Sequence, residues 1–195
     1  MALLHKATLT PTKLELIAGW LPSQPWFPSS ATPGVPEQLG AFRFDDPAGK
    51  VGVETLIVRL PGTAPLQVPL SYREEPLAGA EAWLIGTAEH SVLGTRWVYD
   101  ATGDPVYVGE LAKAILQGGT EVEQFRETDE GRVSVPATAH VRGSGEPGSA
   151  IPVDRDLEVE VIRVLDGTTN PGTAMTLTGT WAGQEEPVLL ATLMF

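Results

Sequence analysis

Helical patterning is scarce in this chain, and that scarcity restricts its fold more than any other feature of the sequence. Only two segments, residues 12–21 and 105–116, repeat apolar residues at the three- and four-residue spacing of an amphipathic helix. A chain that is poor in helices must bury its apolar residues mainly through sheets. The sequence therefore predicts a mostly β protein with two principal helices.

Cap and stop residues give both predicted helices their bounds. Thr10 is the expected N-cap of the first, with Pro11 at the first helical position, where a missing N–H costs nothing. Pro22 ends this helix. Asp104 is the expected N-cap of the second helix, and Gly118 lies just beyond its end.

Short β-prone runs fill most of the remaining chain. They lie at residues 51–60, 66–72, 95–99, 133–141, 157–165, 174–181 and 188–193. Pro69 predicts an edge position for its strand, because proline cannot donate to a sheet ladder. Runs of strands with two interspersed helices, rather than strict β-α-β alternation, predict an α+β fold with mainly antiparallel sheet.

Two segments are predicted loops, and a change of pattern suggests a boundary. Residues 23–40 are rich in proline and serine, and residues 143–152 are dense in glycine, serine and proline. The spacing of apolar residues changes after Gly118 and Gly119, the glycine pair that follows the second helix. We therefore expect two subdomains, residues 1–118 and 119–195, packed on each other.

Charge and cysteine content exclude several classes of function. The chain carries 25 acidic and 13 basic residues, a net charge of −12, and would repel nucleic acid and anionic lipid. The absence of cysteine excludes a disulfide framework, a zinc-thiolate site and a thiol nucleophile. No early apolar run reaches the roughly 7–15 residues of a signal core. We expect a soluble, cytoplasmic protein.

The search for catalytic and cofactor sites finds only weak patterns. Residues 143–148 match G-x-G-x-x-G by letter, but no helix follows, so a loop is favoured over a nucleotide site. Glu89 and His90 are the one adjacent acid–histidine pair, and neighbours on a strand point to opposite faces. Asp45 and Asp46 precede a turn and are expected to cap it. We expect no catalytic residue, no cofactor and no metal.

Aromatic residues supply the candidate binding surface. Trp20, Trp97 and Tyr99 lie in periodic apolar segments and are predicted core residues. Trp26 and Phe27 lie in the proline-rich loop, where packing demands less of them, and exposed tryptophan can stack on sugars or anchor a protein interface.

Three motifs together resemble the N-terminal cap region of maltokinases and related aminoglycoside-phosphotransferase-like sugar kinases. Residues 20–27 read Trp-Leu-Pro-Ser-Gln-Pro-Trp-Phe, similar to the cap's Trp-Leu-x-x-Gln-Arg-Trp-aromatic, with Pro25 in place of arginine. Residues 68–70 resemble its Val-Pro-Leu strand, and residues 99–105 its Tyr-Asp-Ala-x-x-Asp-Pro. The motifs keep the family's order over about residues 1–117. This resemblance adds Gln24 to Trp26 and Phe27 as a candidate partner or ligand surface.

A second similarity covers the following residues and concerns nucleotide binding. In maltokinase a strand there carries the lysine that holds the ATP phosphates. The alignment places Glu160 at that position, where a carboxylate would repel a triphosphate. Glu160 is also explained as a solvent-facing strand residue between Val159 and Val161, and both interpretations stay open. Since the given sequence also stops at Phe195, before a catalytic lobe, the resemblance implies a chain that transfers no phosphate.

Three functional hypotheses follow. The first is a non-catalytic cap-like protein that binds a protein partner, an enzyme of trehalose, maltose or α-glucan metabolism, as the resemblance to maltokinase implies. The second is a small-sugar or glucan-binding module that uses the loop tryptophan. The third is an enzyme of unrecognised type, which only the adjacent pair Glu89 and His90 supports.

Overall fold

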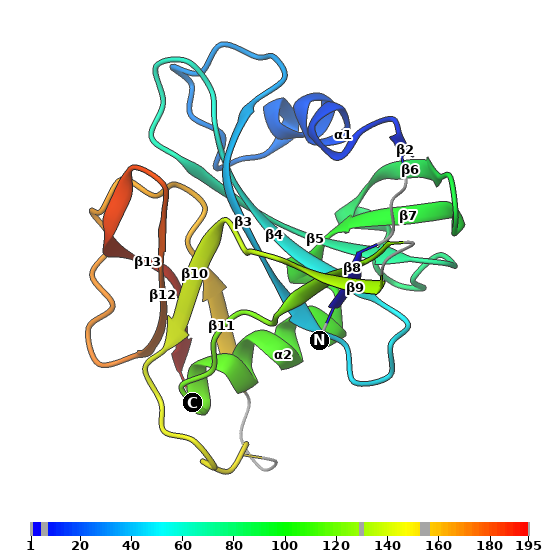
Figure 1. Ribbon diagram of the computed structural model, residues 1–195. Helices are drawn as coiled ribbons and strands as arrows, with labels where there is room; N and C mark the ends of the chain where they lie inside the picture. Colours follow the sequence, from blue (N-terminus) through cyan, green and yellow to red (C-terminus); the bar gives the residue numbers. More distant parts are fainter. Residues whose placement is uncertain (1, 5–7, 129–130, 153–156, 195) are drawn as a thin grey trace.

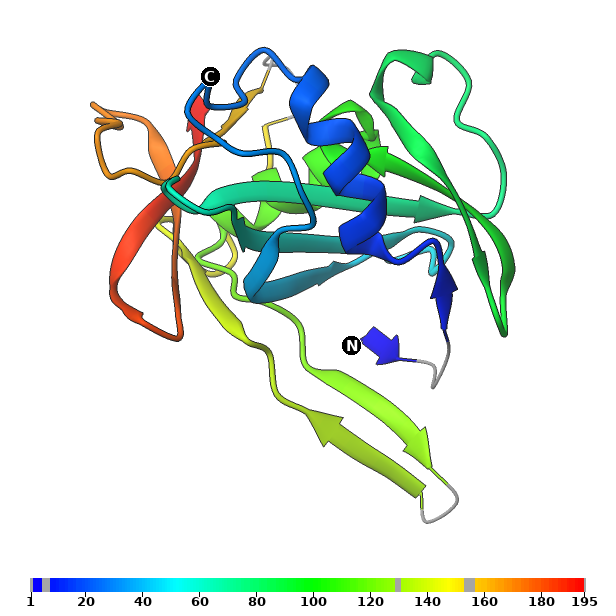
Figure 2. The same cartoon turned by 90° about the horizontal axis from the view of Figure 1, so that it is seen from above.

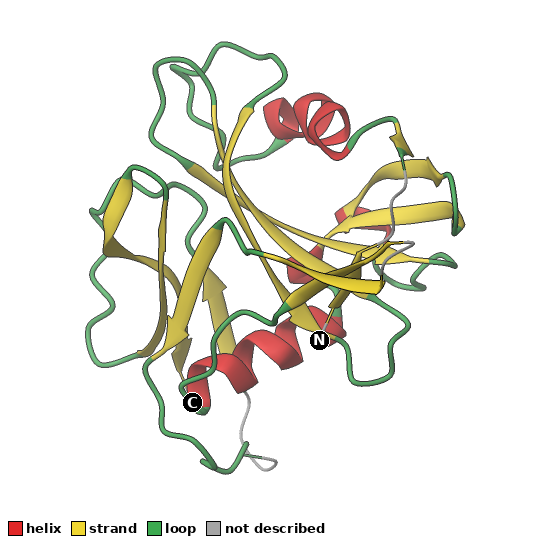
Figure 3. Ribbon diagram, in the orientation of Figure 1, coloured by secondary structure: helices red, strands yellow, loops and turns green. Residues whose placement is uncertain are grey.

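The computed structural model describes residues 2–4, 8–128, 131–152 and 157–194, which form an α+β fold of mainly antiparallel sheets with two helices (Figures 1 and 3). The largest sheet has six strands in the order β2-β6-β7-β5-β4-β3. Its strands are β2 Leu9–Thr10, β3 Glu37–Asp45, β4 Gly52–Arg59, β5 Leu66–Arg73, β6 Leu84–His90 and β7 Gly94–Asp100. This architecture confirms the predicted fold class.

Two smaller sheets complete the described chain. The four-stranded sheet has the order β10-β12-β13-β11, and the three-stranded sheet has the order β1-β8-β9. Their strands are β1 Ala2–Leu4, β8 Gln124–Thr128, β9 Gly131–Val135, β10 Ala139–Gly143, β11 Glu158–Val161, β12 Met175–Trp181 and β13 Gln184–Met194. The run predicted at residues 133–141 is thus two strands, β9 and β10, with Pro136 between them.

Helix α1 (Lys13–Trp20) begins two residues later than its predicted cap. Thr10 lies in β2, opposite Glu89. Thr12 is the N-cap: its hydroxyl accepts from the Glu15 N–H at 3.3 Å, and the Glu15 carboxylate accepts from the Thr12 N–H at 2.8 Å. The prediction of Thr10 was wrong because a threonine three residues before a glutamate forms a reciprocal capping box. The helix gives way to the 3-10 turn η1 (Leu21–Ser23), which contains Pro22.

Helix α2 (Pro105–Leu116) confirms the predicted bounds. The Asp104 carboxylate accepts from the Val106 N–H at 3.0 Å, and Pro105 occupies the first turn. Within the predicted apolar stripe, Leu111 and Ile115 are fully buried. Two further 3-10 turns, η2 (Glu81–Trp83) and η3 (Ala101–Gly103), lie on either side of β6 and β7 along the chain.

Two strand predictions need correction. Strand β5 lies between β4 and β7 and is not an edge, although it contains Pro69. The Gln67 N–H donates to the Arg163 carbonyl at 2.9 Å, and pairing with β7 starts at Leu70, so Pro69 lies between the two sets of bonds. Its missing N–H therefore breaks no ladder bond. The loop predicted up to Gly40 ends earlier, because β3 begins at Glu37.

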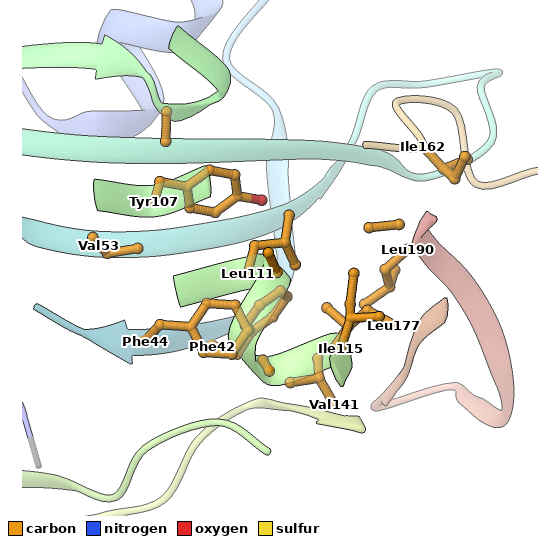
Figure 4. Packing of buried hydrophobic residues seen from close by; sticks show 14 of the residues in the cluster. Phe42, Phe44, Val53, Tyr107, Leu111, Ile115, Val141, Ile162, Leu177 and Leu190 are labelled. Carbon is orange, nitrogen blue, oxygen red and sulfur yellow. The ribbon is translucent and has the colours of Figure 1, made fainter. Parts of the chain in front are cut away.

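The six-stranded sheet separates two hydrophobic clusters. Along β4, Leu56 and Val58 face α1, whereas Val53 and Ile57 face α2. The α2 cluster continues into the four-stranded sheet through Leu177, Leu190 and their neighbours, as Figure 4 shows. Figure 2 shows α1 and α2 on opposite faces of the sheet. Because successive side chains of β4 point to opposite faces of the sheet, this one strand contributes to both hydrophobic clusters.

The proposed division into residues 1–118 and 119–195 stays a prediction. The α2 cluster draws Phe42 and Leu111 from the first range and Leu177 and Leu190 from the second. Over the described ranges, no helix combines the length and apolar character needed to cross a membrane.

Candidate functional site

The predicted surface residues Gln24, Trp26 and Phe27 are each half-buried. The rings of Trp20 and Trp26 meet edge to face at 5.7 Å, and both aromatics of the loop pack against the α1 cluster. Gln24 Nε2 donates to Ser23 Oγ at 2.9 Å. Much of the surface of Gln24, Trp26 and Phe27 therefore contacts other residues of the chain and is not exposed to a partner.

Arg163 occupies one side of Trp26. Its guanidinium carbon lies 5.0 Å from the Trp26 ring centre, a cation–π distance. Arg163 follows β11, so the contact joins the proline-rich loop to a segment more than 130 positions away along the sequence. A sugar that stacked on this face of Trp26 would first have to displace Arg163.

Asp100 holds Arg163 in place. Arg163 Nη2 donates to the two Asp100 carboxylate oxygens at 2.9 and 2.6 Å and to Thr102 Oγ1 at 3.0 Å. The side chains of Arg163 and Asp100 are 14% and 7% exposed. Asp100 also accepts from the Thr102 N–H at 3.2 Å and so caps η3. A nearly buried ion pair of this kind is strongly destabilised when either partner is removed.

Asp104, which belongs to the same motif as Asp100 (residues 99–105), is bound by a second arginine, Arg73. Arg73 Nε and Nη2 each donate to an oxygen of Asp104 at 2.7 Å, a two-pronged ion pair. Burial raises the pKa of Asp104, but the hydrogen bonds from Arg73 and from the Val106 N–H outweigh it and hold that pKa below its usual value. Asp104 thus remains charged while it caps α2.

A third carboxylate, Glu54, lies on the other face of the sheet. It accepts from Lys13 Nζ at 2.8 Å and from the Tyr72 hydroxyl at 3.0 Å, and Arg43 Nη2 lies 3.3 Å away. Glu54 is 7% exposed, and these partners come from α1, β5 and β3. Burial raises the pKa of Glu54, but the charges of Arg43 and Lys13 outweigh it and lower the pKa to about 2. The cluster therefore fastens α1 to the sheet.

This geometry predicts an acid-dependent loss of stability. The pKa of Glu54 falls from 4.5 to about 2 on folding, so its contribution is complete above pH 4.5 and disappears as the pH drops through about 2. A shift of this size corresponds to about 3 kcal/mol. We expect the difference in free energy of unfolding between the wild type and Glu54→Gln, measured by urea titration, to shrink over that pH window.

The exposed Glu160 on β11 supplies the control for this measurement. The difference between wild type and Glu160→Gln is expected to stay near zero at every pH. A wild-type advantage over Glu54→Gln that is unchanged from pH 6 to pH 2 would contradict a stabilising charge on Glu54.

The glycine-rich loop, residues 143–148, packs against the C-terminal end of helix α2, which does not favour phosphate binding. The N–H of Gly145 donates to the Ile115 carbonyl at 2.8 Å, and that of Gly143 donates to the Gly119 carbonyl at 2.9 Å. A Cβ on Gly145 would lie 1.9 Å from the Leu116 carbonyl oxygen. The loop thus meets the carbonyl end of α2, which carries partial negative charge, whereas phosphates bind at N-terminal ends. Close approach to α2 explains these glycines.

Residues 20–104 match the family described as the maltokinase N-terminal cap domain. Over this range the chain is similar to the maltokinase N-terminal cap domain. No curated protein matches the chain. The matched range begins at Trp20 and ends at Asp104, and so includes the first two motifs on which the resemblance rested and all of the third except Pro105. The recognition from sequence is therefore confirmed.

The structure gives the cap motifs an internal role. Trp26 of the first motif touches Arg163, Asp100 of the last motif binds the same arginine, and Asp104 binds Arg73. The Tyr99 hydroxyl accepts from the Leu77 N–H at 2.9 Å. These contacts join segments within residues 20–104 to one another and to the segment after β11. The motif residues therefore hold these segments in position.

The remaining sequence candidates are accounted for locally. His90 Nδ1 accepts from the N–H groups of Val92 and Leu93 at 3.2 and 3.0 Å, which stabilises the β6–β7 turn. Glu89 accepts from Thr95 Oγ1 at 2.7 Å. Asp46 accepts from three turn N–H groups, as predicted for a turn cap.

Glu160 is exposed on β11, which supports its reading as a solvent-facing strand residue. Its neighbours Val159 and Val161 are half-buried, so the strand alternates as expected. Over the described ranges no group of three acidic or histidine residues is arranged to hold a metal ion.

Sequence reasoning missed Arg163 and the Glu54 cluster. Arg163 lay unremarked at the end of a β-prone run, and its partner Asp100 was read only as part of a motif. The signal for Glu54 was present, because it is the single acidic residue in the mostly apolar run that becomes β4. A charge in a strand buried on both faces requires a partner.

Proposed function

We propose that this protein is a non-catalytic cap-domain protein that binds a protein partner, an enzyme of trehalose, maltose or α-glucan metabolism. One observation carries the proposal: the charged side chains of the last cap motif, residues 99–105, bind partners inside the protein. Asp100 and Asp104, the carboxylates of the last motif, are each engaged by an arginine and are 7% and 0% exposed. Groups held in this way build a rigid surface and are not available to a substrate.

The absence of phosphotransfer is part of the same proposal. Two features support it: the exposed carboxylate of Glu160 in the position that the resemblance assigns to a phosphate-binding lysine, and the glycine loop seated on the carbonyl end of α2. Both features disfavour a triphosphate electrostatically. The metabolic setting rests on the cap family, which takes its name from maltokinase.

The partner surface is proposed to be the outer side of the loop between η1 and β3. Trp26 and Phe27 brace this loop from inside, and Val35 is 62% exposed on it. Aromatic residues are enriched at protein interfaces, and this loop combines two of them with an exposed valine. Because Trp26 also supports Arg163, its replacement would disturb the fold, and Val35 is the better probe.

The binding experiment compares two valines of similar exposure. Immobilised wild-type protein is expected to retain a trehalose-, maltose- or glucan-metabolising enzyme from native lysate, identified by mass spectrometry. Val35→Glu is expected to lower that retention at least tenfold. Val92→Glu, at a 58% exposed valine of the β6–β7 turn, is expected to retain the enzyme. Recovery of no such enzyme would count against the proposed partner class.

A separate assay tests the absence of phosphotransfer. The purified chain with ATP, magnesium and maltose, glucose or trehalose is expected to form no sugar phosphate and no ADP above the blank. ATP is also expected to leave the melting temperature unchanged. Formation of sugar phosphate in proportion to the protein added would refute the proposal.

The sugar-binding alternative gains no support from the contacts of Trp26. Arg163 lies over its ring and Trp20 meets it edge to face. Titration of tryptophan fluorescence with maltose, maltooligosaccharides and trehalose separates the two hypotheses, because a saturable change would favour a sugar module.

A further inference from the structure

Trp83 is the most exposed of the five tryptophans in the chain. It is 40% exposed, whereas the other four are half-buried or buried. Trp83 ends the 3-10 turn η2, and its N–H donates to the carbonyl of the buried Ala80 at 3.0 Å. The backbone that carries the ring is therefore held in place, although the ring itself reaches the surface.

One face of the Trp83 ring rests on the backbone of Gly103 in η3. A Cβ added at Gly103 would lie 2.2 Å from Cγ, 2.3 Å from Cδ2 and 2.7 Å from Cδ1 of the indole. A point this close to three ring atoms at once lies over the plane of the ring. The exposed area of Trp83 therefore belongs to the opposite face and the edge of the ring. A ring that is fixed in advance loses little conformational entropy when a ligand stacks on it.

The loop that leads to Trp83 is acidic. Residues 74–83 include Glu74, Glu75 and Glu81, all of them exposed, and the loop contains no lysine, arginine or histidine. Arg73, directly before the loop, is already bound by the carboxylate that caps α2. The loop also contains no serine, threonine, asparagine or glutamine. The open face of the indole thus adjoins a segment whose polar side chains are all carboxylates.

We propose that Trp83 and the acidic loop, residues 74–83, bind an arginine side chain in a basic segment of a partner protein. A guanidinium stacks on the face of a tryptophan ring, and its N–H groups donate to carboxylates in a planar fork. Tryptophan and arginine are also the residues that most often dominate the binding energy of protein interfaces. A neutral sugar also stacks on tryptophan, but it gains nothing from the charge of the loop. The charge of the surface therefore favours an arginine.

A labelled peptide of alternating arginine and glycine tests this surface by fluorescence anisotropy. The matched ligand is the same peptide with citrulline, the uncharged analogue of arginine. The wild type is expected to bind the arginine peptide about fivefold or more tightly than the citrulline peptide, and less tightly as the salt concentration rises. The surface shares no residue with the loop between η1 and β3, so the result does not depend on the partner enzyme proposed for that loop.

Substitutions of the ring identify the stacking contact. Trp83→Ala is expected to raise the Kd of the arginine peptide about fivefold or more, and Trp83→Phe, which keeps an aromatic face, is expected to raise it less. Leu93→Ala removes a leucine that is 42% exposed in the β6–β7 turn and is expected to leave the Kd unchanged. Thermal unfolding of each variant checks that it is folded.

Two double substitutions separate local charge from total charge. Glu74→Gln with Glu75→Gln removes two exposed charges from the loop and is expected to raise the Kd about threefold or more. Glu185→Gln with Glu186→Gln removes two exposed charges from β13 and is expected to have a smaller effect. This pair leaves the contact of Trp83 with the backbone intact, so it tests the proposal even if Trp83→Ala fails to fold.

Four results would refute an arginine site at Trp83. They are equal effects of the two double substitutions, equal affinity of Trp83→Ala and the wild type for the arginine peptide, equal affinity of the wild type for the arginine and citrulline peptides, and no binding at millimolar peptide. Saturable binding of maltooligosaccharides that is lost in Trp83→Ala would assign the ring to a sugar instead.

Discussion

Arg163→Ala is expected to lower the free energy of unfolding by about 3–5 kcal/mol, the usual cost of removing one partner of a buried ion pair. The loss has three sources. Asp100 loses its cation at 7% exposure, Thr102 loses a hydrogen bond, and Trp26 loses the guanidinium over its ring. Urea unfolding measures the change, and the tryptophan emission of the folded state, to which Trp26 contributes, is expected to shift.

The control is the same substitution in an exposed ion pair. Arg59 and Glu37 lie 3.1 Å apart with side chains 49% and 66% exposed, so Arg59→Ala is expected to cost no more than about 1 kcal/mol. Arg163→Lys keeps the charge but loses the planar guanidinium that covers Trp26, and its cost should fall between the two. If Arg163→Ala and Arg59→Ala cost the same, Arg163 does not fasten the cap to the segment after β11.

Local patterning was sufficient where a segment determines its own conformation. The bounds of α2 followed from Asp104, Pro105 and an apolar stripe, and the structure confirms them. The same kind of reasoning failed at Thr10, although the glutamate three residues after Thr12 identified the better cap. Strands β1, β2, β3, β6 and β8 were not predicted. Strand β6 is only partly buried, and the residues of β8 show no clean alternation of apolar and polar side chains.

Long-range pairing was beyond the reach of pattern reasoning. The contact of Arg163 with Asp100 spans 63 positions, and that of Lys13 with Glu54 spans 41. Such contacts depend on how the sheets are ordered, and the sequence alone left that order open. The motif similarity located Trp26 and Asp100 without saying that they meet the same arginine. The recognised family thus marked the right residues, and the structure supplied their role.

Gly143→Ala is expected to destabilise the protein by about 3 kcal/mol or more, at the upper end of the cost of overpacking. A Cβ at this position would lie 1.9 Å from the Ala114 carbonyl oxygen and 2.8 Å from the Ile115 Cα. Both are backbone atoms of α2, so no rotamer change relieves the clash. The loop cannot retreat either, because the N–H of Ser144 donates to the Thr176 carbonyl at 2.9 Å.

Gly34→Ala is the matched control, since a Cβ there has nothing within 4 Å and the backbone does not have positive φ. Its effect on the free energy of unfolding is expected to stay within about 0.5 kcal/mol. If Gly143→Ala does not fold, its far-ultraviolet spectrum is measured again with the stabilising osmolyte trimethylamine N-oxide added. Partial recovery of the spectrum then indicates a native-like but destabilised state. A Gly143→Ala protein as stable as Gly34→Ala would mean that the loop moves freely. In that case, close packing on the carbonyl end of α2 would no longer explain the G-x-G pattern, and the electrostatic argument against a phosphate in this loop would lose its basis.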